Sequence, residues 1–106
     1  MREFLHVDDL ARAILILLKI NKVKLKKITN NELPILNIGS GESISIKNLA
    51  LLIKKISQFK GKIVFDKNYP DGTINKNLDS KKIKKLKWNA KITLPDGLKK
   101  IISTRY

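Results

Sequence analysis

The sequence lacks cysteine altogether, and this absence excludes disulfide scaffolds, thiolate zinc sites and cysteine nucleophiles. The single histidine, His6, argues against a histidine-rich metal site and against a local Ser-His-Asp triad. No run of about 18 apolar residues occurs, so we expect no transmembrane helix. The amino-terminal residues also lack the layout of a secretory signal, so we expect a cytoplasmic protein with no membrane partner and no metal site.

Acidic residues are scarce as well, because 9 Asp and Glu face 23 Lys and Arg and leave a formal net charge of +14. Clustered cations displace counterions from phosphates, so such an excess can indicate nucleic-acid binding. Only 3 of these cations are arginine, the residue whose flat fork suits base and phosphate recognition, and 20 are lysine. Lysine, isoleucine and asparagine, which share A/T-rich codons, supply 45 of the 106 residues. Codon bias on solvated faces therefore explains most of the charge.

The densest basic run spans residues 81–87, and its apolar residues fall three apart. This spacing is typical of a short amphipathic helix with one solvated side. No aromatic residue that could stack on a base occurs in the run before Trp88. A small basic module that binds nucleic acid or another partner therefore remains the alternative function, with nucleic acid the less favoured partner.

The hydrophobic pattern predicts an α/β chain with about four helices and three short strands. We expect strands at 2–7, 34–39 and 62–66. The expected helices span about 10–20, 46–59, 80–86 and 94–104, with caps at Asp8 or Asp9, Ser45, Asp79 or Ser80, and Thr93. Gly61 is expected to end the second helix, and the lysine-rich residues 21–33 are expected to form a loop. The first helix is apolar almost all round, which predicts burial on several sides and calls for more protein than this chain offers nearby.

Three local motifs favour structural roles over chemistry. Gly39-Ser40-Gly41 lacks the third glycine of a dinucleotide fingerprint, and the Glu42 that follows would repel phosphate, so a turn is the better interpretation. Asp8 and Asp9 could be metal ligands or acid/base carboxylates, but their place at a helix start favours capping. His6 lies in an apolar segment without a paired nucleophile, so we expect a packed, hydrogen-bonded histidine.

Two basic residues and one carboxylate are candidates for binding a phosphorylated ligand. Arg2 is one of few arginines in a lysine-dominated chain, which suggests that its bidentate geometry matters. The turn-forming segment 69–73 carries Asp71, and Lys76 follows it. A carboxylate and an ammonium on one loop could hold ribose hydroxyls and a phosphate. An ordinary surface turn is about equally favoured by composition alone.

The string Met-Arg-Glu-Phe-Leu-His-Val-Asp-Asp-Leu-Ala at residues 1–11 resembles a segment of the extended short-chain dehydrogenase/reductase (NAD-dependent epimerase/dehydratase) family. Asn37–Gly41 and Ser45–Ala50 are similar to a strand end and a helix start of the family, in the same order. Pro70-Asp-Gly-Thr73 resembles a loop of the GDP-L-fucose synthases within this family. The similarity spans essentially the whole chain except the loop at 21–33.

The resemblance implies that Arg2, Asp71 and Lys76 bind the sugar nucleotide. Arg2 matches an arginine that contacts its diphosphate, Asp71 lies in the nucleotide-sugar loop, and Lys76 matches a lysine that approaches the substrate. The chain departs from the family pattern in two places. Ile-Asn-Lys at 74–76 replaces Pro-Arg-Lys, so one arginine is lost, and Leu-Lys-Trp at 86–88 replaces Leu-Gly-Trp, which suggests a relaxed helix end.

The resemblance also implies an NADPH-dependent enzyme that makes GDP-L-fucose from GDP-4-keto-6-deoxy-mannose by two epimerisations and a hydride transfer. The family's Ser-Tyr-Lys set is missing, because neither Tyr69 nor Tyr106 has a lysine four residues on. The family's glycine-rich NADP fingerprint is missing as well. Residues 1–106 are therefore expected to be an incomplete domain, the C-terminal nucleotide-sugar-binding portion without the N-terminal Rossmann domain. We expect no catalytic residue, no bound cofactor and no activity of the chain alone. Its expected partners are a GDP-sugar and either a separately encoded N-terminal half or a second copy.

Overall fold

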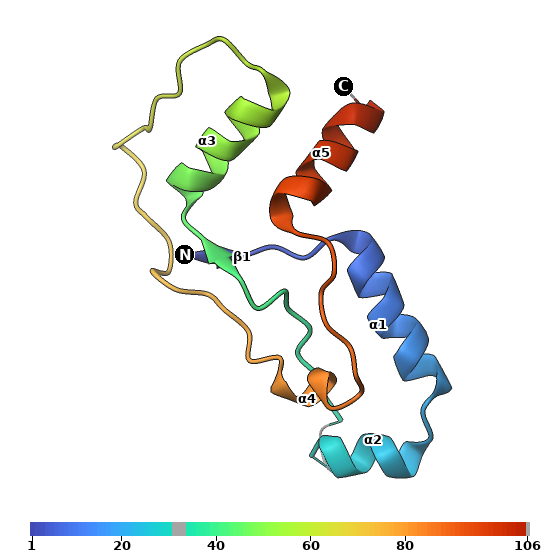
Figure 1. The fold of residues 1–106 in the computed structure, drawn as a ribbon. Coiled ribbons are helices and arrows are strands. Elements are labelled where there is room, and N and C mark those ends of the chain that lie inside the picture. Colours follow the sequence, from blue (N-terminus) through green and yellow to red (C-terminus); the bar gives the residue numbers. More distant parts are fainter. Residues whose placement is uncertain (31–33, 106) are drawn as a thin grey trace.

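The computed structural model describes residues 1–30 and 34–105, so residues 31–33 of the expected loop, and Tyr106, lie outside the described residues. Within these ranges the chain is mostly helical, with one small antiparallel sheet (Figure 1). The elements in chain order are β1 (Arg2–Glu3), α1 (Val7–Lys19), α2 (Lys22–Ile28), β2 (Ser43–Ile44), α3 (Ile46–Ser57), α4 (Lys81–Lys84) and α5 (Leu94–Arg105). The predicted α/β class is therefore correct in having both kinds of element, but helices dominate.

The sheet is smaller than the sequence pattern predicts. β1 pairs with β2 so that Arg2 faces Ile44 and Glu3 faces Ser43. The strands expected at 34–39 and 62–66 do not form, although both segments lie within the described residues. A strand needs a paired neighbour for its backbone groups, and residues 34–39 and 62–66 form no ladder with the rest of the described chain.

One expected helix cap and one expected loop are wrong. The α1 helix is capped by His6, whose Nδ1 accepts a hydrogen bond from the Asp8 N–H at 3.1 Å, so neither Asp8 nor Asp9 is the cap. The segment expected to be a loop contains the helix α2, capped by Asn21, whose Oδ1 accepts from the Lys24 N–H at 2.7 Å. Lysines interleaved among the apolar residues of α2 conceal its periodicity in the sequence.

The other caps follow the prediction more closely. Ser45 Oγ accepts from the Asn48 N–H at the start of α3, and Thr93 Oγ1 accepts from the Asp96 N–H at the start of α5. The α3 helix ends earlier than expected, because Gln58 adopts a left-handed conformation with φ of 57° before Gly61 is reached.

The expected third helix is only one turn long. Asp79 Oδ1 accepts from the Lys81 N–H at 3.1 Å, while Ser80 Oγ is turned away and accepts from the Gly39 N–H at 2.8 Å. The chain leaves the helical turns that follow α4 through Lys87, which has φ of 61°. This is the position where the family pattern has glycine, and a side chain makes left-handed backbone costly.

The core lies where α4 and the turn after it pack against α1. Its buried members are Ala13, Ile83, Leu86 and Trp88. Partly buried residues pack against them from α1 and its flanking residues, from α2, from the segment 34–39 and from the segment after α4. A second contact joins α3 and α5, which lie side by side (Figure 1). The molecule is thin, with principal extents of 54 × 33 × 17 Å, so the core is small.

The outward face of α1 is not covered by the described residues, so burial of this helix on several sides would need further protein, as the sequence predicts. Ala13 is fully buried, but Leu18 is 76% exposed and Leu15 is 55% exposed. Val7, Leu10 and Ile14 extend this apolar face toward the start of the helix. Among residues 1–30 and 34–105, no helix combines the length and the apolar character needed to cross a bilayer.

Candidate functional site

The strand β1 lies between β2 and the segment that carries the predicted nucleotide-sugar loop (Figure 1). On this second edge, the Met1 nitrogen donates to the Ile74 carbonyl at 2.5 Å, and the Lys76 N–H donates to the Met1 carbonyl at 3.3 Å. Arg2 and Lys76 form a parallel bridge. Two candidate residues more than 70 positions apart in the sequence are thus brought together by backbone pairing.

The Arg2 side chain lies against the same loop. Its Nη1 donates to the Thr73 carbonyl at 2.6 Å and to the Met1 carbonyl at 2.9 Å. Gly72 packs close to the same guanidinium, because a Cβ at Gly72 would lie 3.0 Å from Arg2 Nη2. A side chain at this position would therefore require a small shift of the Arg2 guanidinium.

Asp71 and Lys76 are both exposed and flank the part of the loop that Arg2 touches. The structure therefore brings Arg2 next to the loop that carries the other two candidates. Whether the three side chains bind one ligand stays a prediction.

The sequence analysis missed Glu3, whose carboxylate joins two segments far apart in the chain. Its Oε2 accepts from the Gly41 N–H at 2.8 Å, and its Oε1 accepts from the Leu78 N–H at 3.3 Å. Gly39 packs so closely that a Cβ there would lie 2.2 Å from Glu3 Oε1. Gly39 and Gly41 indicate a close approach of another group to the backbone, but the sequence does not identify that group as Glu3.

The Gly39-Ser40-Gly41 turn does not fit the pyrophosphate of a dinucleotide cofactor. Its Gly41 N–H already donates to a carboxylate, which takes the place that an anion would need. The turn leads into β2 and not directly into a helix, so the positive end of a helix dipole is missing there as well. The structural interpretation of this turn is thus supported, and no chemical step through NADP(H) is derived for the chain.

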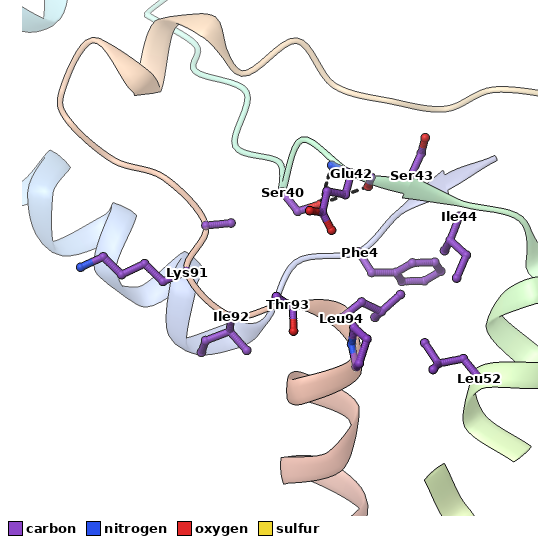
Figure 2. Close-up of a pocket in the computed structure, with 12 residues that line it drawn as sticks. Phe4, Ser40, Glu42, Ser43, Ile44, Leu52, Lys91, Ile92, Thr93 and Leu94 are labelled. Carbon is purple, nitrogen blue, oxygen red and sulfur yellow. Dashed lines mark hydrogen bonds between the residues drawn. The ribbon is translucent and has the colours of Figure 1, made fainter. Parts of the chain in front are cut away.

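A cavity of about 230 Å³ opens beside the small sheet, between β1, β2, α3 and the start of α5. Phe4, Ile44 and Leu52 form its apolar side, and Ser40 and Glu42 form its polar side (Figure 2). Leu94 and Pro95, in the first turn of α5, also line it. None of the predicted binding residues lines this cavity, so it is separate from the Arg2 loop site.

Asp9 is a buried anchor and not a cap or a metal ligand. The residue is 1% exposed. Its carboxylate accepts from the Lys91 N–H at 3.1 Å and from the Ile92 N–H at 2.9 Å. Its carbonyl accepts from Trp88 Nε1 at 3.0 Å. Asp9 thus ties the start of α1 to the segment between α4 and α5.

An arginine completes this buried arrangement. Arg12 Nη2 donates to Asp9 Oδ1 at 2.5 Å and to the Asn89 carbonyl at 2.8 Å, and the guanidinium lies 5.9 Å from the centre of the Trp88 ring. Burial by itself raises the pKa of Asp9, but the hydrogen bonds from two backbone N–H groups and from Arg12 outweigh burial and hold the pKa below its ordinary value. Asp9 is therefore ionised at neutral pH and its oxygens are already occupied, which makes it a structural group.

His6 is packed and hydrogen-bonded, as predicted. Its side chain is 8% exposed, and its Nδ1 accepts from a backbone N–H, so the proton of the neutral ring sits on Nε2. Gly97 of α5 packs against the ring, since a Cβ at Gly97 would lie 2.9 Å from His6 Cδ2.

The lysine run offers charge without a stacking surface. Lys81, Lys82, Lys84 and Lys85 are all exposed. Trp88, the aromatic residue nearest to them, is 0% exposed and cannot stack on a base. This arrangement supports the view that the lysines form a solvated face.

Comparison with known proteins finds no family model that matches, but it finds curated relatives. The chain is 44% identical over 98 residues to GDP-L-fucose synthase 1 of Arabidopsis thaliana, covering 92% of this chain and 28% of that protein. It is 40% identical over 98 residues to GDP-L-fucose synthase of Escherichia coli (strain K12), covering 92% and 30%. It is 39% identical over 99 residues to GDP-L-fucose synthase of Sinorhizobium fredii, covering 93% and 29%. The chain thus spans less than a third of the length of these relatives.

Proposed function

This chain is homologous to GDP-L-fucose synthases over most of its length, and on that basis we propose that it forms the nucleotide-sugar-binding part of such an enzyme. One observation carries the proposal: backbone pairing places Arg2 directly beside the loop that holds Asp71 and Lys76. Two cations and a carboxylate gathered at one edge match the chemistry of a nucleoside diphosphate, which offers phosphate oxygens and ribose hydroxyls.

Each side chain has a distinct task in this proposal. The Arg2 guanidinium has five N–H donors and uses Nη1 on the Thr73 and Met1 carbonyls, so donors remain for diphosphate oxygens. Lys76 adds a second positive charge on the same edge. Asp71 accepts hydrogen bonds from the ribose hydroxyls. A carboxylate beside a diphosphate would be repulsive without these two cations.

The chain alone binds its ligand but does not transform it, because the Tyr-x-x-x-Lys pair of the family is absent from the sequence. The two epimerisations and the NADPH hydride transfer belong to the whole proteins that it resembles. Purified chain incubated with GDP-4-keto-6-deoxy-mannose and NADPH should therefore show no NADPH oxidation above a blank without protein. Turnover above that blank would contradict this part of the proposal.

Binding is tested with GDP as the probe, by isothermal titration calorimetry and by NMR shift mapping at low ionic strength. We expect shifts confined to residues near β1 and 70–76. Arg2→Ala and Lys76→Ala should each lower the affinity by about tenfold, the loss of one charged hydrogen bond. Lys99→Ala, an exposed cation on α5, is the matched control and should bind as the unmodified chain does.

The alternative, a basic binding module, predicts a different result. Charge reversal at Lys81, Lys82, Lys84 and Lys85 would then abolish submicromolar nucleic-acid binding with a steep salt dependence. In our proposal the same set leaves GDP binding unchanged. The two outcomes separate the functions without any assumption about the ligand sugar.

The exposed apolar face of α1 supports a second proposal, association with another polypeptide. Val7, Leu10, Ile14, Leu15 and Leu18 form this face, which we call the outward face of α1. Contiguous apolar patches of this kind are rarely left open in soluble monomers. We propose that in the purified chain a second copy covers it. A separately encoded N-terminal half is the competing occupant.

A further inference from the structure

We propose that Glu3 is a positioning residue that fixes the nucleotide-sugar loop in place, an inference that rests on the proposed function and deepens it. Glu3 carries no predicted contact with a ligand. Its carboxylate instead joins the loop end at Leu78 to the turn at Gly41. Loss of this carboxylate should loosen the loop without disturbing the core.

The loop is held at two points by neighbouring residues of one strand. Arg2 holds it near its start through the Thr73 carbonyl, and Glu3 holds it near its end through the Leu78 N–H. Successive side chains of a strand point to opposite faces, so the two contacts reach the loop from different sides. Lys76 lies between the two held points and pairs with β1 through its own N–H. The position of its ammonium group therefore depends on both contacts.

The Gly39–Gly41 turn gives the carboxylate a fixed base. Gly41 has φ of 85°, which suits glycine, and its N–H points to Glu3 Oε2. Gly39 leaves no room for a side chain beside Glu3 Oε1. The Gly39 N–H is itself tied to the buried Ser80 Oγ, so the turn is anchored to the segment just before α4. Glu3 thus links an exposed loop to a turn that is itself anchored in the fold.

The hydrogen bonds from the Gly41 and Leu78 N–H groups require that both oxygens of the Glu3 carboxyl group act as acceptors. An ionised carboxylate accepts with both oxygens, whereas the amide of glutamine offers one oxygen and one NH₂ donor. Glu3→Gln keeps the shape of the side chain but turns a donor toward one of the two N–H groups. Gly39→Ala tests the same contact from the other side, because its Cβ displaces the carboxylate without changing its charge.

Amide hydrogen exchange by NMR provides the deciding measurement. In Glu3→Gln and Gly39→Ala we expect exchange at Leu78 and Gly41 to rise about tenfold, the loss of roughly one charged hydrogen bond. Exchange of the buried Trp88 indole N–H should stay unchanged. Glu42→Gln, an exposed carboxyl on the same turn, is the matched control and should leave both amides unchanged.

The second readout is GDP affinity, which should fall about fivefold to tenfold in both variants while the thermal midpoint stays within a few degrees. Unchanged exchange at Leu78 overturns the inference, and so does a rise that includes the Trp88 indole. Equal GDP affinity of the variants and the unmodified chain also overturns it. If the unmodified chain does not bind GDP, the proposed function fails, and exchange at Leu78 still decides whether Glu3 holds the loop.

Discussion

Glu3 and Asp9 can be compared directly, because both carboxylates accept hydrogen bonds from backbone N–H groups of distant segments but differ in how deeply they are buried. Glu3 accepts from the Gly41 and Leu78 N–H groups, and Asp9 accepts from two backbone N–H groups between α4 and α5. Asp9 is 1% exposed, whereas Glu3 is only half-buried. Asp9 also accepts from Arg12, and we expect its burial, more than this additional hydrogen bond, to decide that it holds the fold while Glu3 holds one loop.

The physical reason is the cost of leaving a polar group unpaired. Near the surface, water replaces a lost acceptor, so removal of the Glu3 carboxylate costs little beyond local order. At Asp9, which is 1% exposed, water cannot readily replace a lost acceptor, and the Arg12 guanidinium, whose side chain is 34% exposed, would lose its charged partner.

Asp9→Asn should have the largest effect, a loss of about 2 to 4 kcal/mol in the free energy of unfolding. The amide keeps the size of the side chain but turns a donor toward a backbone N–H or toward Arg12. Urea unfolding followed by Trp88 fluorescence measures the change. Asp8→Asn is the matched control, because Asp8 is 64% exposed and should change stability by less than about 0.5 kcal/mol. Equal losses in the two variants would refute the role of burial.

Leu18→Lys should weaken self-association through the outward face of α1. Leu18 is 76% exposed, and burying a leucine contributes about 1.5 to 3 kcal/mol, so the dissociation constant of a dimer should rise at least about tenfold. Val64→Lys is a matched control, because Val64 is also 76% exposed but lies far from α1 in the chain. Light scattering across a concentration series measures both. A monomer at all concentrations would exclude a second copy as the occupant of this face.

Acid should destabilise the chain through Asp9, by less than Asp9→Asn does, because the hydroxyl of a protonated carboxyl carries one hydrogen and can still accept, whereas the amide nitrogen carries two hydrogens and accepts none. The pKa of Asp9 in the folded state lies below the ordinary value of 3.8. Its ionised form therefore stabilises the fold fully above that value, and this stability is lost as the pH falls through the folded pKa. Urea midpoints from about pH 6 to about pH 2 should fall more steeply for the unmodified chain than for Asp9→Asn. Parallel curves would contradict the assignment.

Some local features of the fold could be predicted from the sequence, although the helix α2 and the His6 cap could not, and features that depend on distant pairing could not. The caps at Ser45 and Thr93 follow from residues three positions apart. The strands expected at 34–39 and 62–66 have suitable composition, but a strand also needs a neighbour, which composition does not reveal. The same limit explains why β2 was not foreseen, since it exists through its pairing with β1.

The same limit holds for the candidate site, where residue types could be predicted from the sequence but contacts between distant positions could not. Arg2, Asp71 and Lys76 were selected by residue type and family resemblance, and the structure brings Arg2 to the loop through contacts that span 71 positions. Glu3 was missed because its partners lie 38 and 75 positions away. A carboxylate at a helix start is typical of a cap, so the sequence predicts capping by Asp8 or Asp9, which is wrong. The partner of Asp9 at Ile92 is 83 positions distant.

Lys87→Gly should produce the smallest effect and the only gain, about 1 kcal/mol in the free energy of unfolding. Lys87 has φ of 61°, a conformation that glycine adopts without strain, and it directly precedes the buried Trp88. Lys85→Gly is the matched control, because Lys85 has φ of −63° and gains nothing from glycine, so that variant should lose stability. Urea unfolding separates the two, and losses in both would show that Lys87 is not strained. Lys87 lies next to the buried core and not in the nucleotide-sugar loop. Lys87→Gly should therefore leave the amide exchange rate of Leu78, which reports local opening of that loop, unchanged.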